Sequence, residues 1–188
     1  TIAGNGTSNS IPTGDGGPAT AAGLYYPRSI AIDGDGNIYV DHANVVRKIS
    51  SATGIITPFA GGGPCCQSGD GGPALSAYLT TVNSIATDAF GNVFIGDAAR
   101  IRKVNPSGTI STVAGTGFSG FGGDGGPATS AQLEWVLSVA ARSSGDLVIA
   151  DVGNRRIRLV TASDGFIQTI GGSGPPGFTG DGGPGGAG

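Results

Sequence analysis

The segment Asp33-Gly34-Asp35-Gly36-Asn37 places three oxygen-bearing side chains at alternate positions, as the start of a calcium-binding loop does. Such loops need a bidentate glutamate at their twelfth position, and that position here is Asn44. A glycine followed by asparagine also supplies the positive φ that a tight hairpin requires. We therefore expect a hairpin turn at this segment, with a calcium loop as the alternative, and we expect no metal site and no cofactor.

His42 is the only histidine in the chain. One histidine cannot build the multi-histidine metal site of a lyase, and no nucleophile motif accompanies it. We expect His42 to lie in a surface loop.

Three aspartates precede three arginines by a few residues. A carboxylate beside an arginine suits an enzyme that orients an electrophile, but an active site needs only one such pair. The recurrence favours a structural Asp–Arg pair, or an aspartate that caps the backbone, in every repeat. The residues are Asp41 with Arg47, Asp97 with Arg102, and Asp151 with Arg158.

Cys65 and Cys66 are adjacent, and together they are the whole cysteine content of the chain. They can form a strained vicinal disulfide, or each can bond elsewhere; the Cys-x-x-Cys spacing of a redox or zinc site is absent. We favour oxidised cysteines, as in secreted proteins. Asn5-Gly6-Thr7 matches the N-glycosylation sequon, which would require an extracellular location.

Three aromatic residues, Tyr25, Tyr26 and Trp135, follow a leucine at matching places in the chain. Aromatic residues at such positions either pack between repeats or contact a partner protein. We keep both interpretations and treat the three residues as a candidate interface.

The pentapeptide Gly-Asp-Gly-Gly-Pro recurs at intervals of about 55 residues, and a fixed period of this order is the signature of solenoids, propellers or arrays. Its glycines could cradle an anion with backbone N–H groups, but the lysine and hydroxyl residue of a phosphate loop are missing. We expect a compact loop whose aspartate caps its own backbone. The four copies are Gly14–Pro18, Gly69–Pro73, Gly123–Pro127 and Gly180–Pro184.

Each of the first three copies is followed by four short segments that alternate apolar and polar residues, separated by glycine-containing turns. This period of two predicts strands, and no stretch has the sustained 3.6-residue period of a helix. Four-stranded units of this length are typical of propeller blades.

Composition excludes some function classes. The 188 residues carry a net charge of −3, and only 12% of them are charged. Nucleic-acid binding relies on a basic surface, which this balance does not provide. No apolar run approaches the length of a membrane-spanning helix, so we expect no membrane insertion.

The repeat also resembles a known family. Asp-x-x-Gly-Asn, an apolar strand ending in Asp, Ile-Arg-Lys-Val and Thr-Val-Ala-Gly-Thr-Gly follow one another as in the NHL repeat. The best match is Ile101–Leu133 joined to Val148–Val160. The resemblance implies an all-β propeller, a fold that often has six blades in this family. The Gly-Asp-Gly-Gly-Pro insertion resembles a subtype common in secreted and cell-surface proteins.

We expect residues 1–188 to form one propeller segment of about three complete blades. An extra strand is predicted at 1–4, repeat units at about 14–68, 69–122 and 123–179, and a truncated loop at 180–188. Three blades are fewer than a closed propeller typically has, so we expect part of a larger propeller or array.

The predicted function is a non-enzymatic extracellular or cell-surface module of a larger surface or filament protein. Its predicted partners are proteins, through self-association or neighbouring domains, with glycans as a further candidate and nucleic acid excluded. One alternative is a propeller enzyme, a metal-dependent lyase or a lactonase-like hydrolase, with its site in other blades. The other is an intracellular NHL scaffold.

Overall fold

The computed structural model describes residues 1–7, 10–65 and 69–174. Alternation of apolar residues, interrupted by Gly-Asn and Gly-Asp turns, folds this part of the chain into three antiparallel sheets. In each sheet four consecutive strands pair in sequence order, so the connections between these four are hairpins. This is the architecture of propeller blades, and it confirms the predicted all-β fold class.

The strands have similar bounds in each sheet. The first sheet contains β1 (Ile30–Ile32), β2 (Ile38–His42), β3 (Val45–Ile49) and β4 (Ile56–Ala60). The second contains β5 (Val82–Thr87), β6 (Val93–Asp97), β7 (Arg100–Val104) and β8 (Ile110–Ala114). The third contains β10 (Val136–Ala141), β11 (Leu147–Asp151), β12 (Arg156–Val160) and β13 (Phe166–Gly171), with β9 (Gly126–Pro127) added at its outer edge.

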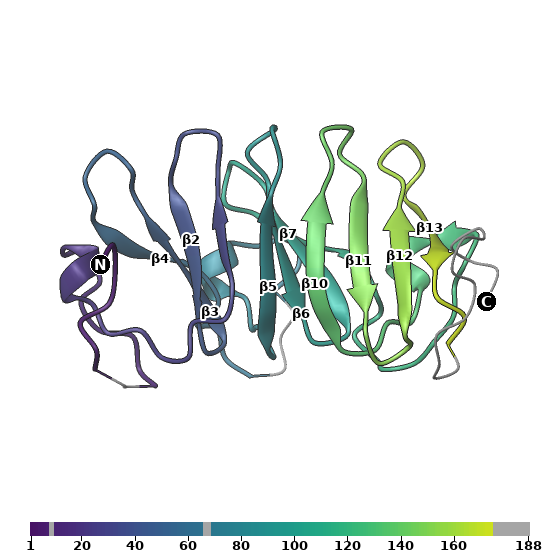
Figure 1. Ribbon diagram of the computed structural model, residues 1–188, viewed down its shortest axis with the longest axis horizontal. Coiled ribbons are helices and arrows are strands. Elements are labelled where there is room, and N and C mark those ends of the chain that lie inside the picture. The colour runs from purple at the N-terminus through teal and green to yellow at the C-terminus, as the bar shows by residue number, and fades with distance from the viewer. Residues whose placement is uncertain (8–9, 66–68, 175–188) are drawn as a thin grey trace.

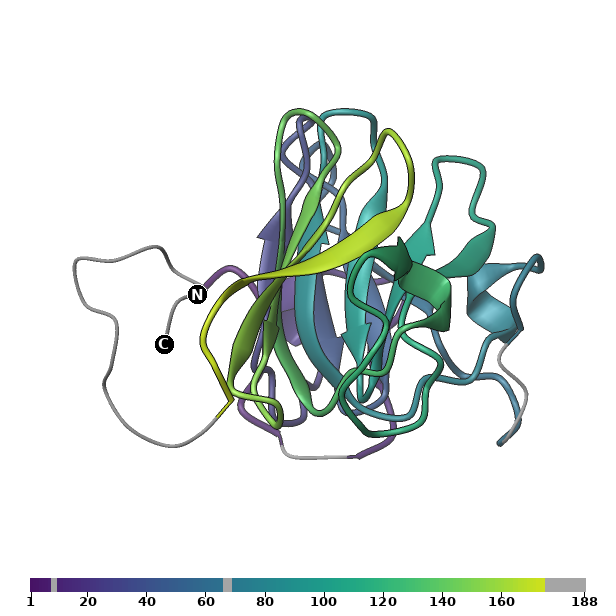
Figure 2. The same cartoon turned by 90° about the vertical axis from the view of Figure 1, so that its right-hand side faces the viewer.

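The three sheets stand in a row, and each packs its face against the next (Figure 1). Seen from the end of the row, they lie one behind another (Figure 2). One core cluster joins the first and second sheets and includes Tyr39, Val46 and Ile85. Another joins the second and third and includes Ile101 and Val139. A sheet with two apolar faces needs such neighbours, because one sheet alone leaves both faces in water.

Short 3₁₀ turns precede each inner strand, at η1 (Ala19–Ala21), η2 (Ala74–Ser76) and η3 (Ala128–Ser130). Their first alanines are buried against the sheets. None of the helices in the described ranges is long and apolar enough to cross a membrane.

Residues 1–4 are not part of a strand in the described structure. Gly4 N–H nevertheless donates to Ala19 O, as Gly61 donates to Ala74 and Gly115 to Ala128. The first residues therefore lie where the end of an outer strand lies in the other repeats. Their assignment to a preceding blade, like the other predicted repeat boundaries, stays a prediction, and the loop at 180–188 lies outside the described residues.

Candidate functional site

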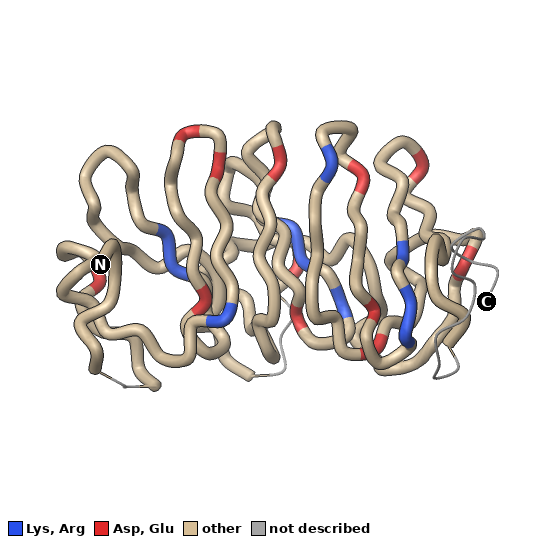
Figure 3. The backbone as a smooth tube through the Cα atoms, in the orientation of Figure 1, with Lys and Arg blue, Asp and Glu red and all other residues tan. Residues whose placement is uncertain are grey.

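Three arginines lie at the same place in the three sheets, near the middle of β3, β7 and β12, and all three are fully buried. Each forms an ion pair with the aspartate of the Gly-Asp-Gly-Gly-Pro loop that begins its own repeat. The N···O distances are 2.6 Å for Arg47–Asp15, 2.6 Å for Arg102–Asp70 and 2.7 Å for Arg158–Asp124. Figure 3 shows that Lys and Arg residues are spread over the three sheets rather than gathered at one place.

This pairing corrects the expectation that the loop aspartate caps its own backbone. In the second and third repeats the other carboxylate oxygen accepts a hydrogen bond from a threonine of the outer strand. Thr112 Oγ1 lies 2.8 Å from Asp70 Oδ2, and Thr169 Oγ1 lies 2.7 Å from Asp124 Oδ2. The loop is therefore fixed to the arginine and to the outer strand of its own sheet.

The loop backbone also pairs with that outer strand. Gly71 N–H donates to Ile110 O, and Ile110 N–H donates to Gly72 O, so the loop covers the start of the edge of β8. Covering an edge in this way removes a template for pairing with other chains. The pentapeptide thus extends its own sheet, in addition to separating one repeat from the next along the chain.

The predicted aspartate column is only partly correct. Pairing places Val40 opposite Arg47, Ile95 opposite Arg102 and Ile149 opposite Arg158. Two residues further along, on the same face of the strand, stand Asp97 and Asp151 in the second and third sheets. The equivalent residue of the first sheet is His42, because Asp41 lies one position earlier and on the other face.

Asp97 and Asp151 each cap the backbone and contact the buried arginine. Asp97 Oδ1 accepts from Thr80 N–H, and Asp151 Oδ1 accepts from Glu134 N–H. The second oxygens lie 3.8 Å from Arg102 Nη1 and 3.2 Å from Arg158 Nη1. Both aspartates therefore have structural roles, as backbone caps and as partners of the buried arginines.

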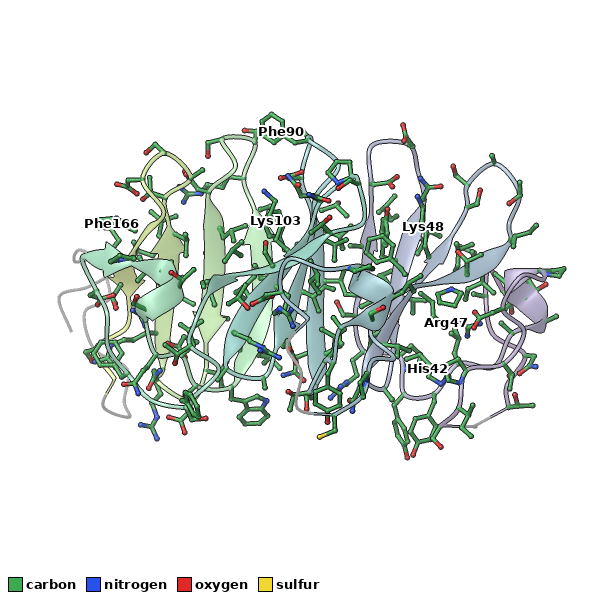
Figure 4. All side chains as sticks on the ribbon, turned by 180° about the vertical axis from the view of Figure 1, so that it is seen from behind. His42, Arg47, Lys48, Phe90, Lys103 and Phe166 are labelled. Atoms are coloured by element: carbon green, nitrogen blue, oxygen red, sulfur yellow. The ribbon has the colours of Figure 1, made fainter. Side chains whose placement is uncertain are left out.

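His42 is buried, with 1% of its surface exposed, so its predicted place in a surface loop is wrong. Its Nδ1 accepts from Tyr25 N–H at 3.3 Å, the same contact that Asp97 and Asp151 make in the other sheets. Nε2 lies 3.3 Å from Ser10 O, which fits a neutral ring with its proton on Nε2. Figure 4 shows His42 and Arg47 on the first sheet.

Acidification is expected to destabilise the fold through His42. Burial lowers the pKa of His42, and the charge of nearby Arg47 lowers it further. The unfolded chain then binds a proton more readily than the folded one below the ordinary pKa of about 6.5. The free energy of unfolding should therefore be constant above about pH 7 and fall below pH 6.5, by at most about 1.4 kcal/mol per pH unit.

Because the chain has one histidine, urea unfolding between pH 5 and 7.5 isolates this effect. His42→Gln, which cannot titrate, is the control and should flatten the profile in that window. A wild-type profile that is already flat would contradict the assignment.

The segment Asp33–Asn37 forms the hairpin between β1 and β2. Asp33 Oδ1 accepts from Asn37 N–H at 2.8 Å, and Asn37 Nδ2 donates to Oδ2 at 2.9 Å. Burial raises the pKa of Asp33, but the hydrogen bonds from Asn37, Tyr39 and Asp35 outweigh it and leave the pKa below its usual value. The second sheet repeats the arrangement with Asp88 and Asn92.

Two other predicted sites are only partly described. Cys65 is exposed and forms no disulfide with another described residue, and Cys66 lies outside the described residues. Asn5 is exposed; its Oδ1 accepts from Thr7 N–H and Thr7 Oγ1, and its Nδ2 donates to Ala21 O. The disulfide and the glycan stay predictions.

Of the three candidate interface residues, Tyr25 and Tyr26 contact each other, and Trp135 belongs to another repeat. Tyr25 and Tyr26 are in edge-to-face contact with ring centroids 4.7 Å apart, and Tyr25 is half-buried next to His42. Tyr26 and Trp135 are exposed at equivalent positions, with φ of 47° and 48°. Bulky residues rarely adopt this left-handed conformation, and where they do, a functional constraint is one cause.

Sequence reasoning missed a set of contacts that hold neighbouring sheets together. Arg28 Nη2 donates to Val82 O at 2.6 Å, and Asn83 Nδ2 donates to Val136 O at 3.0 Å. Arg28 and Asn83 occupy equivalent positions, each directly before a serine. The available signal was a polar side chain at this position in two of the three repeats; the third has Leu137.

The family model described as the teneurin NHL domain matches residues 6–64 and 63–119. Human Teneurin-4 is 32% identical over 168 residues, which cover 78% of this chain and 6% of that protein. The chain thus spans a small part of the length of its curated relatives.

Solved structures show the same fold at low identity. A Bacteroides thetaiotaomicron protein of unknown function is 16% identical with a TM-score of 0.59, covering 78% of this chain and 36% of that one. A streptogramin B lyase is 16% identical with a TM-score of 0.50, covering 77% and 40%. At these identities the likeness concerns the fold alone.

Proposed function

This chain belongs to the teneurin NHL domain family, and we propose that it is a non-enzymatic, extracellular structural and protein-interaction module of a larger surface or filament protein. Membership of this family supports the role in protein interaction. The exposed sequon at Asn5 supports the extracellular location.

The observation that carries the proposal is the uncovered apolar surface at both ends of the row of sheets. Ile30 of the first sheet is 65% exposed, whereas its equivalents Ile85 and Val139 are each 5% exposed between sheets. Ile157 of the third sheet is 40% exposed, whereas its equivalent Ile101 is 0% exposed. Apolar positions of this kind favour contact with another blade, from a neighbouring domain or a second copy of this chain.

We further propose that Tyr26 and Trp135 form a second contact surface, away from the end faces. Both are exposed and hold the left-handed conformation, which has a cost in stability. Large aromatic side chains are enriched in protein interfaces.

A propeller enzyme is the alternative function. In the described ranges, no group of three or more His, Cys, Asp or Glu side chains is placed to hold a metal ion. The Asp–Arg pairs recur in all three sheets and make structural contacts. An enzymatic site would therefore have to draw on other residues, and no observation on this chain favours it.

Removing the apolar end faces is expected to abolish self-association of the 188-residue chain. Ile30→Asp combined with Ile157→Asp places charges on the two exposed faces, where either substitution alone should change the free energy of unfolding by only about 0.5 kcal/mol. Sedimentation velocity over a concentration series measures the association.

The matched control is Tyr26→Ser combined with Trp135→Ser, which leaves the end faces intact and should leave self-association unchanged. Loss of association in this control alone would assign the contact to the aromatic surface. A wild-type chain that stays monomeric at all concentrations would remove the support for contact through the end faces.

A further inference from the structure

A groove opens between the second and third sheets, on the side seen in Figure 4, where Phe90 lies above Lys103. Its volume is about 640 Å³, within the range of small-molecule sites. One wall comes from the second sheet, and the other from the β10–β11 hairpin and the start of the third repeat. The residues that line the groove include Phe90, Phe94, Lys103, Val113, Thr129 and Ser144.

The repeat itself explains why the groove is open. The equivalent positions at the first junction carry Tyr39 for Phe94, Phe59 for Val113 and Leu75 for Thr129. There, Tyr39 and Phe59 pack edge to face with ring centroids 4.7 Å apart. The second junction lacks this aromatic pair, because Val113 is smaller than Phe59.

Lys103 is the cation of this groove. Its equivalent, Lys48, lies over the Tyr39 ring at 5.5 Å from the centroid. Within the described part of the chain, Lys103 has no ion pair or ring partner. It therefore offers an ammonium group to a ligand.

The nearby carboxylates are engaged elsewhere. Asp88 Oδ1 accepts from Phe90 N–H and Asn92 N–H, and its Oδ2 accepts from Asn92 Nδ2. Asp164 Oδ1 accepts from Phe166 N–H. A bound anion would therefore meet Lys103 without displacing an internal ion pair.

The rest of the groove presents an aromatic surface beside hydroxyl groups. A Cβ atom at Gly145 would lie 3.9 Å from Phe90 Cε2, so the Phe90 ring reaches the hairpin of the third sheet. Phe94 and Val113 line the apolar part, and Thr129 and Thr161 contribute hydroxyls that make no hydrogen bond within the described residues. Flat apolar faces with a few polar groups suit a ring that carries both C–H and O–H groups.

A peptide fits the groove less well. Recognition of an extended peptide usually adds a strand to an open sheet edge, which supplies main-chain hydrogen bonds. At this junction the start of β8, at Ile110, is already paired with Gly71 and Gly72. The groove therefore offers side chains, and not backbone groups, to a ligand.

We propose that this groove binds an acidic sugar unit of a glycan, with its carboxylate on Lys103, a C–H face against Phe90 and Phe94, and its hydroxyls toward Thr129 and Thr161. The site is built from the chain's own residues and does not depend on self-association through the end faces. It adds a small-molecule ligand to the proposed interaction module.

The test is a titration of the 188-residue chain, followed by NMR, with glucuronic acid and with glucose, which lacks the carboxylate. Glucuronic acid should bind saturably and glucose at least about tenfold more weakly, because a charge-assisted hydrogen bond is lost. Lys103→Gln should remove that difference, and Lys48→Gln, at the junction filled by aromatic residues, should leave the affinity unchanged.

A second variant refills the groove with the residues of the first junction, Val113→Phe combined with Thr129→Leu. It should abolish binding while thermal unfolding shows that the fold is kept. Equal binding of the two sugars, no binding of either, or unchanged affinity in the refilled variant would overturn the proposal. So would binding of acetyl-Glu-Glu-amide in preference to glucuronic acid, which would make this a peptide site.

Discussion

Replacing Arg158 with methionine is expected to lower the free energy of unfolding by about 3–5 kcal/mol, because removing one partner leaves a buried charge uncompensated. The guanidinium lies between Asp124 of the loop and Asp151 of β11, and Asp151 has no exposed surface. It also donates to Gln132 O and Gly122 O. Methionine preserves part of the volume, so the loss reports mainly on charge and hydrogen bonds.

Arg47→Met is the matched control, because its loss strands no buried carboxylate. Arg47 donates to Gly23 O and Thr13 O and pairs with Asp15, whose side chain is 30% exposed and can be hydrated. The residue at the register position of Asp151 is here the neutral His42. The cost should therefore be clearly smaller than that of Arg158→Met, as measured by urea unfolding. Equal losses would show that the strand aspartate does not contribute.

The repeat and its strands were predictable from the sequence because their signals are local. Alternating apolar residues beside a Gly-Asn turn specify a hairpin within about ten residues. The turn from Asp33 to Asn37 follows this rule and is repeated at Asp88. Recurrence of the pentapeptide then identified the unit that contains four such strands.

The contacts that fix the loops could not be predicted in the same way, because their partners are far apart in the chain. Asp15 and Arg47 are 32 residues apart, as are Asp70 and Arg102, while Asp124 and Arg158 are 34 apart. Counting from the pentapeptide would have found this spacing. Pairing each arginine with the aspartate nearest in sequence led instead to Asp41.

The sequence also suggested the wrong equivalent for Asp41, because a shift of one residue moves a side chain to the other face of the strand. Its sequence neighbours suggested equivalence with Asp97, but pairing gives that place to His42. Asp41 instead accepts from Arg28 N–H and Ser29 N–H at 2.7 Å. The groove beside Lys103 was likewise not foreseen, since it depends on the size of side chains such as Val113 that come together only in the folded sheets.

Replacing Gly115 with alanine is expected to lower the free energy of unfolding by about 3 kcal/mol, from left-handed backbone strain and from a clash with neighbouring backbone. Gly115 has a φ of +83° and follows β8, where the chain passes under the β6–β7 turn. An added Cβ would meet Ala99 O and would lie 2.8 Å from Arg100 Cα. Backbone atoms cannot move aside as a flexible side chain can.

Gly61 and Gly172 hold the same place in the other sheets, with φ of +89° and +80°, and their Cβ positions also meet a turn carbonyl. The glycine directly after each outer strand is therefore required for the close approach of the chain to the turn, and not only for its left-handed backbone conformation. Gly125→Ala is the matched control: its φ is +78°, but no atom lies within 4 Å of the added Cβ. That variant should lose about 1–2 kcal/mol, the cost of the left-handed conformation alone. Equal losses in the two variants would mean that the turn above Gly115 moves aside, so that the junction between outer strand and loop is softer than its contacts indicate.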